Sequence, residues 1–569
     1  MTAPSAWWRD AVVYQVYVRS FADADGDGIG DLAGLQAQLP YLEMLGVDAV
    51  WLNPCYPSPQ VDHGYDVADY TDIEPAYGDL AAFDDLLADV HARGLRLLLD
   101  LVPNHCSSRH PWFQAALAAG PGSPERDRFM FRDGRGPGGD EPPNNWRSVF
   151  GGPAWTRVAG AEGALGAWYL HLFDSGQPDF NWRNQHVGDL FEQVLRFWFD
   201  RGVDGFRIDV AHGLVKDPEL PDWDRLSPQG PAPMWNQPDV HEVYRRWRRV
   251  ADSYTGRDLT LVGEIWVPRV EDLALYLRPD ELPQAFYFDL LTQPWRARGV
   301  RSAIEQGLAH IAAAGAAVTW TLSNHDVHRA VTRYGQDQSA VVADSDDPAA
   351  ATRFRGPVDL AQGQQYTRAA ILMLLALPGS VYLYQGEELG LPEVLDLPLE
   401  ARQDPVVLRS EGAMLGRDGC RVPFPWVHDE PSFGFSLGSD DRADRADRAG
   451  SAEPEAPWLP QPAWFADYSA DLELADASSF LSLYRRGLEL RRPYFSGPAA
   501  PLEWLEIEGR ADAFAFRRGT SVCAVVFGAD ALELPVSWGD VVLASAPVDL
   551  RNAPGGSAVW LSSKGGSRG

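Results

Sequence analysis

Lysine is almost absent from this chain of 569 residues: only Lys216 and Lys564 occur, so arginine supplies nearly all of the positive charge. Cysteine is scarce as well. Its spacing fits neither a zinc site nor a dense disulfide framework, so we expect reduced thiols at Cys55, Cys106, Cys420 and Cys523. No apolar run approaches the roughly 18 residues that span a bilayer, and Met1 to Asp10 does not resemble a secretory leader. We therefore expect a cytoplasmic protein with no membrane partner.

Basic charge is in deficit over the whole chain. The 49 basic residues face 80 acidic ones, which gives a formal net charge of -31. Nucleic acid and anionic membranes would repel such a surface, so neither is an expected partner. The 45% of hydrophobic residues is typical of a globular protein, and the length is ample for a large core with further domains attached.

Short apolar runs alternate with longer helical patterns along most of the chain. This alternation is typical of repeated βα units and a parallel sheet. We predict eight strands, at Val12–Tyr17, Ala49–Leu52, Arg96–Val102, Gly205–Asp209, Thr260–Glu264, Ala285–Phe288, Val318–Ser323 and Val381–Gln385. Eight such units fit an α/β fold, the (β/α)8 TIM barrel, whose pocket forms at the C-terminal ends of the strands.

The rest of the chain divides into three further parts. Residues 105–176 are rich in Gly, Pro and Trp and predict a subdomain inserted after the third strand, between barrel segments 1–104 and 177–492. Residues 429–457 are polar and contain an Asp-Arg-Ala repeat at Asp441–Ala449, which predicts a surface insertion. Alternating apolar residues in 493–569 predict a C-terminal all-β domain.

Polar side chains stand at four of the predicted strand ends. Arg207 and Asp209 close the apolar run Gly205–Val210, and burying such a pair is costly unless the pair is satisfied. A core ion pair would account for these two residues alone. The other three ends carry Asp100, Asn104 and His105; Glu264; and Asn324, His325 and Asp326. Four such endings in order predict one shared pocket.

In this order and spacing, the four segments resemble the conserved regions of the alpha-amylase superfamily, glycoside hydrolase family thirteen. The resemblance runs from about Trp8 to the C-terminus. A fifth segment, Gln177–Trp182, is similar to the Gln-Pro-Asp-Leu-Asn-Trp signature of the oligo-1,6-glucosidase and alpha-glucosidase branch, with Phe180 in place of Leu.

The resemblance implies three catalytic carboxyl groups. Cleaving a glycosidic bond with retention needs two carboxyl groups about 5 to 5.5 Å apart. By resemblance Asp209 is the nucleophile and Glu264 the acid/base, and Arg207 would hold Asp209 ionised. Asp326 would grip the 2- and 3-hydroxyls of the sugar, although a loop-capping Asp is the plainer alternative.

Further residues would form the wall of the glucose site. His105 and His325 would donate hydrogen bonds to the glucose unit, and Phe150 and His212 are additional candidates, although a lone His is more often structural. The segment His63-Gly64-Tyr65-Asp66 resembles the glucose-end motif of the family. There Tyr65 would stack on the ring, and Asp66, paired with Arg417, would bind a terminal hydroxyl. Such a pair would close the pocket and predicts an exo-acting enzyme.

A calcium-like loop lies near the N-terminus. Asp23, Asp25, Asp27 and Asp31 place oxygen donors at alternate positions, with Gly28 sixth and the Ile29 carbonyl seventh. The usual Glu at position twelve is missing, and a Gly/Asp-rich turn without metal is the alternative. The family branch carries a cation here, so we expect structural calcium, or magnesium, held by Asp23, Asp25, Asp27, Ile29 and Asp31.

Three functions are compatible with these features. The first is a retaining alpha-glucosidase that acts on short oligosaccharides such as maltose. The second transfers the glucosyl unit to another acceptor, as transglucosidases, trehalose synthases and sucrose isomerases do, although the isomerase Arg-Leu-Asp-Arg-Asp loop is absent after Asp326. The third is a non-enzymatic binding protein, which the three carboxyl residues disfavour.

The bond that is cleaved is less clear than the reaction class. In this branch the residue after the nucleophile tends to be Val in enzymes for α-1,6 bonds, and here it is Val210. The following Ala211–Leu214 does not match oligo-1,6-glucosidases. We expect α-1,4 preference and keep α-1,6 open, since one methyl group is worth only about 1 to 3 kcal/mol.

Overall fold

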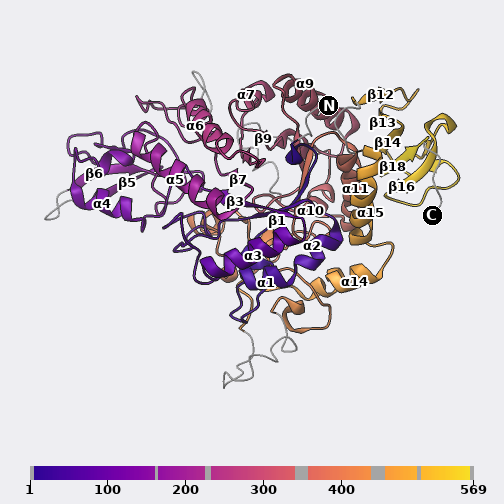
Figure 1. Cartoon of the computed structure of the whole chain (residues 1–569), viewed down its shortest axis with the longest axis horizontal. Coiled ribbons are helices and arrows are strands. Elements are labelled where there is room, and N and C mark those ends of the chain that lie inside the picture. Colours follow the sequence, from indigo (N-terminus) through magenta and orange to yellow (C-terminus); the bar gives the residue numbers. More distant parts are fainter. Residues whose placement is uncertain are drawn as a thin grey trace.

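A computed structural model describes residues 6–159, 165–224, 232–339, 356–436, 455–495 and 501–563. Its centre is an eight-stranded parallel sheet (Figure 1) with the strand order β10-β11-β1-β2-β3-β7-β8-β9. The strands are β1 (Val12–Val16), β2 (Ala49–Leu52), β3 (Arg96–Leu101), β7 (Gly205–Ile208), β8 (Thr260–Gly263), β9 (Gln284–Ala285), β10 (Thr319–Thr321) and β11 (Ser380–Tyr384).

The sheet closes on itself between its two outer strands. Phe286, just after β9, forms a parallel bridge with Thr319 of β10, and the Tyr287 N–H donates to the Thr319 carbonyl. The predicted TIM barrel is thereby confirmed. The strand predicted at Ala285–Phe288 is wrong at its end, because α8 begins at Phe288, whose ring stacks on Trp266 at 4.0 Å instead of continuing the ladder.

Helices surround the barrel and bury their apolar faces against the strands. In α5, Val187, Phe191, Val194 and Trp198 recur at helical spacing and are fully buried. The barrel helices are α1 (Leu32–Ala37), α2 (Leu39–Leu45), α3 (Leu80–Ala92), α5 (Gln185–Arg201), α6 (Val240–Asp252), α7 (Val270–Leu275), α8 (Phe288–Leu291), α9 (Ala297–Ala313), α10 (Ala330–Tyr334) and α11 (Leu360–Ala376).

Between β3 and β7 the chain leaves the barrel, where the sequence predicts an insertion. It forms α4 (Pro111–Ala119) and a small antiparallel sheet of β4 (Phe131–Arg132), β6 (Leu165–Leu170) and β5 (Trp155–Ala159). A separate apolar cluster that includes Trp146, Trp155 and Leu170 lies beneath this sheet. This part projects at one end of the molecule, opposite the C-terminal sheet (Figure 1).

After β11 come α12 (Pro405–Arg409), α13 (Asp418–Arg421), α14 (Ala470–Ala475) and α15 (Phe480–Phe495). The predicted Asp441–Ala449 repeat lies outside the described residues. The C-terminal antiparallel sheet contains β12 (Glu503–Leu505), β13 (Ala513–Arg518), β14 (Ser521–Val526), β18 (Ser557–Ser562) and β16 (Asp540–Ala544), with β15 (Leu532–Glu533) and β17 (Asn552–Ala553) paired beside it. The predicted all-β domain is confirmed.

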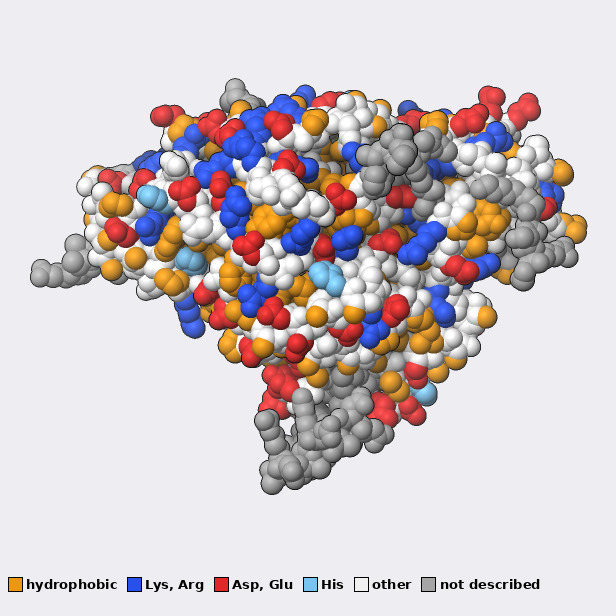
Figure 2. All heavy atoms as spheres, viewed as in Figure 1, with side chains coloured by type: hydrophobic (Ala, Val, Ile, Leu, Met, Phe, Trp, Pro, Cys, Tyr) orange, Lys and Arg blue, Asp and Glu red, His pale blue; other side chains and the backbone are white. Residues whose placement is uncertain are grey.

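The C-terminal sheet is joined to the barrel by direct contacts. The Trp560 indole N–H donates to the Leu372 carbonyl of α11, and the Trp560 ring packs on Phe495 of α15. On the face shown in Figure 2, acidic and basic side chains are interspersed over the described surface. No helix of the described ranges has both the length and the hydropathy that a bilayer span requires. All four cysteines are buried and free.

Candidate active site

The guanidinium of Arg207 joins three carboxyl groups from three neighbouring strand ends. Its Nη1 lies 2.8 Å from Oδ1 of Asp100 and 2.8 Å from Oδ1 of Asp209, and its Nη2 lies 2.8 Å from Oε2 of Glu264. Parallel register produces this arrangement, because Asp100 of β3 is the direct partner of Arg207 on β7. Asp209 and Glu264 follow the last residues of β7 and β8, so both face the same end of the barrel.

In this cluster of Arg207 and three carboxyl groups, burial outweighs the effect of the guanidinium on the pKa values of Asp100 and Asp209. Burial raises the pKa of Asp100 to about 7 although Arg207 opposes the rise. Burial also raises the pKa of Asp209 well above its ordinary range; Arg207 opposes this, and the charges of Glu264 and Asp100 add to it. Because Asp100 and Asp209 share one guanidinium, their titrations are linked. Arg207 therefore stabilises the ionised form of Asp209 against the effect of burial.

The two oxygens of Glu264 have different neighbours. Oε2 accepts hydrogen bonds from Arg207 and from the Val210 N–H at 3.0 Å, whereas Oε1 accepts one from the Trp266 indole at 3.0 Å. Oε1 therefore has fewer hydrogen-bond donors around it than Oε2. Val210 has a left-handed backbone with φ 45°, which is strained for a β-branched residue, and this conformation directs its N–H at Glu264.

Two guanidinium groups and the His325 imidazole surround Asp326. Its Oδ1 lies 3.0 Å from both Arg417 and Arg421, and its Oδ2 lies 3.3 Å from His325. Burial alone would raise the pKa of Asp326, but His325 and the two guanidinium groups hold it well below its usual range. Asp326 is therefore an ionised hydrogen-bond acceptor.

Tyr65 and His325 form a stacked pair at the centre of the site. Their rings lie 5.2 Å apart and nearly parallel, and the Tyr65 hydroxyl is 2.6 Å from Nε2 of His325. Gln15 on β1 contacts Nδ1 of the same ring at 2.7 Å, and Asn53 donates to the Tyr65 hydroxyl. Burial lowers the pKa of His325 well below its ordinary value, so the ring is neutral and can still donate or accept a hydrogen bond.

The predicted pairing of Arg417 with Asp66 is wrong. Arg417 lies 2.8 Å from Asp62 and 2.7 Å from Asp404, in addition to Asp326. Asp66 instead accepts hydrogen bonds from the Ser58 hydroxyl and from the N–H groups of residues 61 and 62. The carboxylate that faces the arginine is therefore Asp62, and Asp66 holds the loop together.

The sequence around Asp62 has the pattern of a tight turn, and this pattern could have identified Asp62 as a site residue. The Tyr65 N–H donates to the Asp62 carbonyl, and the two residues between them, His63 (φ 50°) and Gly64 (φ 101°), both have left-handed backbones. Asp-x-Gly-x is typical of such tight turns, which bring the first and fourth residues together. Asp62 and Tyr65 therefore enter the site side by side. Gln177 of the fifth predicted motif donates to Asp62 at 3.1 Å.

The remaining predicted wall residues surround this centre. Phe150 lies beneath the Arg417 guanidinium at 5.1 Å. His105 contacts the Tyr65 carbonyl at 3.1 Å, and His63 contacts Arg19 at 2.7 Å. His212 lies beside the Trp266 backbone at 3.5 Å, and burial lowers its pKa to about 4. All four side chains are buried close to this centre.

Several residues of the site were not predicted from the sequence: Asp62, Asp404, Arg421, Trp266 and Lys216. Lys216 is buried and lies 2.7 Å from Asp179 and 2.6 Å from Asn104, so it fastens the segment after Asp209 to the barrel residues that flank the inserted subdomain. Lys216 is one of only two lysines in the chain, and this rarity could have identified it as a residue of interest. Asp62, Asp404 and Trp266 stand in loops and Arg421 ends the short helix α13, and a single sequence does not reveal how these segments pack.

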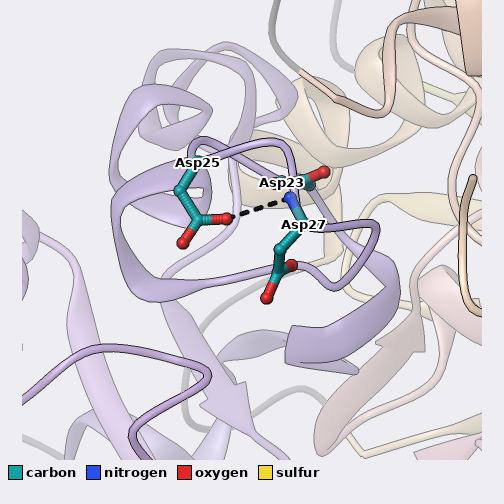
Figure 3. Close-up of side chains that lie close together, drawn as sticks. All are labelled: Asp23, Asp25 and Asp27. Atoms are coloured by element: carbon teal, nitrogen blue, oxygen red, sulfur yellow. Dashed lines mark hydrogen bonds between the residues drawn. The ribbon is translucent and has the colours of Figure 1, made fainter. Parts of the chain in front are cut away.

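The acidic loop lies apart from the Arg207 cluster. Carboxylate oxygens of Asp23, Asp25 and Asp27 lie within 4.8 Å of one another (Figure 3). Burial and the neighbouring carboxylates raise the pKa of Asp27 to about 6, the repulsion expected where oxygen donors converge. Asp31 caps α1 through the Gly34 N–H. This all-oxygen donor set fits a hard divalent cation.

A closed parallel barrel that carries paired carboxyl groups at its C-terminal end belongs to the class of barrel hydrolases that can cleave glycosidic bonds. The family described as alpha amylase, catalytic domain, matches residues 15–496. The chain therefore belongs to the alpha-amylase family of glycoside hydrolases.

Known proteins resemble the chain over most of its length. It is 34% identical to a probable alpha-glucosidase of Rhizobium meliloti (strain 1021), covering 92% of this chain and 89% of the relative. It is 33% identical to an oligo-1,6-glucosidase of Parageobacillus thermoglucosidasius, over 86% and 84% of the two chains. The crystal structure of the alpha-glucosyl transfer enzyme XgtA matches with a TM-score of 0.77 and 33% identity over 98% of each chain.

Proposed function

We propose that this protein is a retaining, exo-acting alpha-glucosidase that releases glucose from the non-reducing end of short α-linked gluco-oligosaccharides. The observation that carries the proposal is the sharing of one guanidinium by Asp209 and Glu264, with the ionised Asp326 beside them. Two carboxyl groups placed together in this way are what double displacement at a sugar carbon requires.

In the first step, a carboxylate oxygen of Asp209 bonds to the anomeric carbon as the glycosidic C–O bond breaks. The bonding electrons pass to the leaving oxygen, which takes the proton from Oε1 of Glu264. In the second step, the Glu264 carboxylate takes a proton from water, and the water oxygen displaces Asp209 from the sugar. Two inversions at the same carbon give net retention, and Arg207 contacts both carboxyl groups throughout.

The exo action that we propose depends on the pair Asp62–Arg417. Asp62 and Arg417 are both buried, and Phe150 packs beneath the guanidinium. Such a pair at the glucose end offers charged hydrogen-bond partners to terminal hydroxyls and leaves no opening for further sugar units. Maltose-type α-1,4 bonds remain our expected substrate, with α-1,6 bonds as the alternative.

Transfer of glucose to an acceptor other than water is the second candidate. It is favoured by the similarity to a solved alpha-glucosyl transfer enzyme, which is comparable in identity to the glucosidase relatives. Hydrolysis and transfer share the glucosyl-enzyme and differ only in the acceptor.

Product analysis tests the proposal. The purified chain is incubated with maltose, isomaltose and sucrose, and the products and their anomeric form are followed by NMR. We expect α-glucose as the first product, released fastest from maltose. Transfer products alone would contradict hydrolysis, and β-glucose as the first product would contradict retention.

We also propose that the acidic loop binds calcium, or magnesium, in a structural role. Asp23, Asp25 and Asp27 would supply carboxylate ligands, with the Ile29 carbonyl and Asp31 next to them. A bound divalent cation would relieve the repulsion among these carboxylates. The four buried free thiols support our proposal that the protein works in a reducing compartment such as the cytoplasm.

A further inference from the structure

Trp458 lies between the acidic loop Asp23–Asp31 and the glucose end of the site. Its backbone N–H donates to the Gly28 carbonyl at 3.0 Å, and Glu455 does the same to Gly26 at 2.9 Å. A Cβ on Gly28 would lie 2.3 Å from the Ala456 carbonyl oxygen, so the two segments are in close contact. The position of Trp458 therefore depends on the shape of the acidic loop.

The indole of Trp458 supports a guanidinium that faces the site. The Arg19 guanidinium lies 3.8 Å above the centre of the Trp458 ring, and the indole N–H donates to the Ser20 hydroxyl at 2.9 Å. Nη1 of Arg19 then reaches Nδ1 of His63 at 2.7 Å, and the His63 ring lies 5.2 Å from Trp458. Arg19 and His63 are both buried, so these contacts are shielded from water.

His63 is a strained residue in the turn that carries Asp62 and Tyr65. Its φ of 50° is unfavourable for a residue with a side chain, and Asp62 and Tyr65 stand on either side of the strained pair 63–64. A left-handed residue persists only when its surroundings hold it. The Arg19 guanidinium and the Trp458 ring both contact the side chain of His63, and Trp458 positions Arg19 for its contact.

We infer that Trp458 is a positioning residue that holds the turn Asp62–Tyr65 in its binding conformation and transmits the shape of the acidic loop to the glucose site. Its effect on catalysis rests on the proposed function, whereas its effect on the turn does not. Asp209 and Glu264 are anchored separately by Arg207, so loss of Trp458 weakens sugar binding more than it slows the chemical step.

The test compares Trp458→Ala with Trp464→Ala. Trp464 is a half-buried indole that packs on Phe465 and Tyr468, so its removal controls for the loss of a tryptophan from the same region. We expect Trp458→Ala to raise KM for maltose and the inhibition constant of glucose about tenfold, as for the loss of a desolvated cation–π contact. Its kcat should change less than about threefold, because Arg207 still holds the two reacting carboxyl groups.

Hydrogen exchange provides a readout that does not need activity. Backbone amides of residues 61–66 should exchange faster in Trp458→Ala than in the wild-type chain or Trp464→Ala. Gly28→Ala, which must displace residue 456, should produce the same change from the side of the loop. Trp458→Phe keeps a ring beneath Arg19 but loses the bond to Ser20, so its KM should fall between those of wild type and Trp458→Ala.

The outcomes separate the inference from the proposed function. Unchanged exchange at residues 61–66 in both Trp458→Ala and Gly28→Ala would overturn the inference even if the enzyme is a glucosidase. A fall in kcat as large as the expected rise in KM, with KM itself unchanged, would also overturn the inference. Trp458 would then act on the reacting carboxyl groups. If the wild-type chain cleaves no α-glucoside, the proposed function fails, and the exchange measurement alone decides the role of Trp458.

Discussion

Replacing Asp62 and Asp66 one at a time separates sugar binding from loop stability, although the two carboxylates are four residues apart. Asp62 faces Arg417, Gln177 and the proposed glucose end, whereas Asp66 accepts hydrogen bonds from residues 58, 61 and 62 of its own loop. Asp62→Asn keeps the shape of the side chain and removes the charge. Asp66→Asn does the same at the neighbouring position, so the two variants are matched controls for each other.

The expected magnitudes follow from these partners. A hydrogen bond to a charged group contributes about 1.5 to 3 kcal/mol, so loss of the Asp62 charge should lower kcat/KM for maltose about tenfold to a hundredfold. Asp66→Asn turns one acceptor oxygen into an N–H donor opposite N–H and O–H groups. This should cost about 1 to 3 kcal/mol of folding free energy and lower Tm, with kcat/KM within about threefold of wild type.

The assay measures kcat/KM at a temperature well below both melting transitions, and Tm by calorimetry on the same samples. Arg417 keeps Asp326 and Asp404 as partners in Asp62→Asn, so this variant should still fold. An activity loss in Asp66→Asn as large as that in Asp62→Asn, at matched stability, would refute the assignment of Asp62 to the glucose end and restore Asp66.

Three further predictions concern other groups. Glu264→Gln should slow maltose cleavage about 100- to 10,000-fold but slow formation of the glucosyl-enzyme from an activated aryl glucoside far less, and equal losses in pre-steady-state rates would remove Glu264 from the acid role. Burial raises the pKa of Glu387 to about 7 from 4.5, so the wild type should lose stability as pH rises through this range. Glu387→Gln keeps an acceptor for Tyr484, and its Tm relative to wild type should therefore increase from about pH 5 to 8; a constant difference would contradict this. A chelator should lower Tm and added calcium should restore it, whereas Asp25→Asn with Asp27→Asn should abolish the response; a chelator effect that survives in this variant would place the cation elsewhere.

The barrel and its reacting residues could be predicted because they depend on short-range patterns. A polar residue after an apolar run marks a strand end, and parallel strands align their ends, so Asp209, Glu264 and Asp326 were expected in one pocket. Register alone brings Asp100 opposite Arg207. The strand at Ala285–Phe288 failed at its end because an aromatic run continues into a helix, and apolarity does not distinguish the two.

The loop partners could not be predicted in the same way. Asp404 directly precedes α12, Arg417 directly precedes α13, and their side chains form an ion pair. Arg421 forms an ion pair with Asp326, which is distant in the sequence. Nothing in the spacing of these residues fixes their contacts. The predicted motif ended at Asp66, the residue after Tyr65, but in this tight turn Asp66 is bonded within its own loop and Asp62, three positions before Tyr65, lies beside it.

The same difference between strands and loops separates the residues of the proposed chemistry from those of the proposed sugar choice. The chemistry that we propose depends on Arg207, Asp209 and Glu264, whose backbones are fixed by ladder hydrogen bonds such as Asp209 N–H to Leu101 and Glu264 N–H to Ile208. In the same proposal the choice of sugar depends on Asp62 and Arg417, which lie outside the strand ladder and meet through a side-chain ion pair. Relatives with the same barrel can therefore share the glucosyl-enzyme step and differ in substrate or acceptor, because changing a loop contact leaves the ladder intact. A change in the ladder would instead move both reacting carboxyl groups at once and remove the shared step.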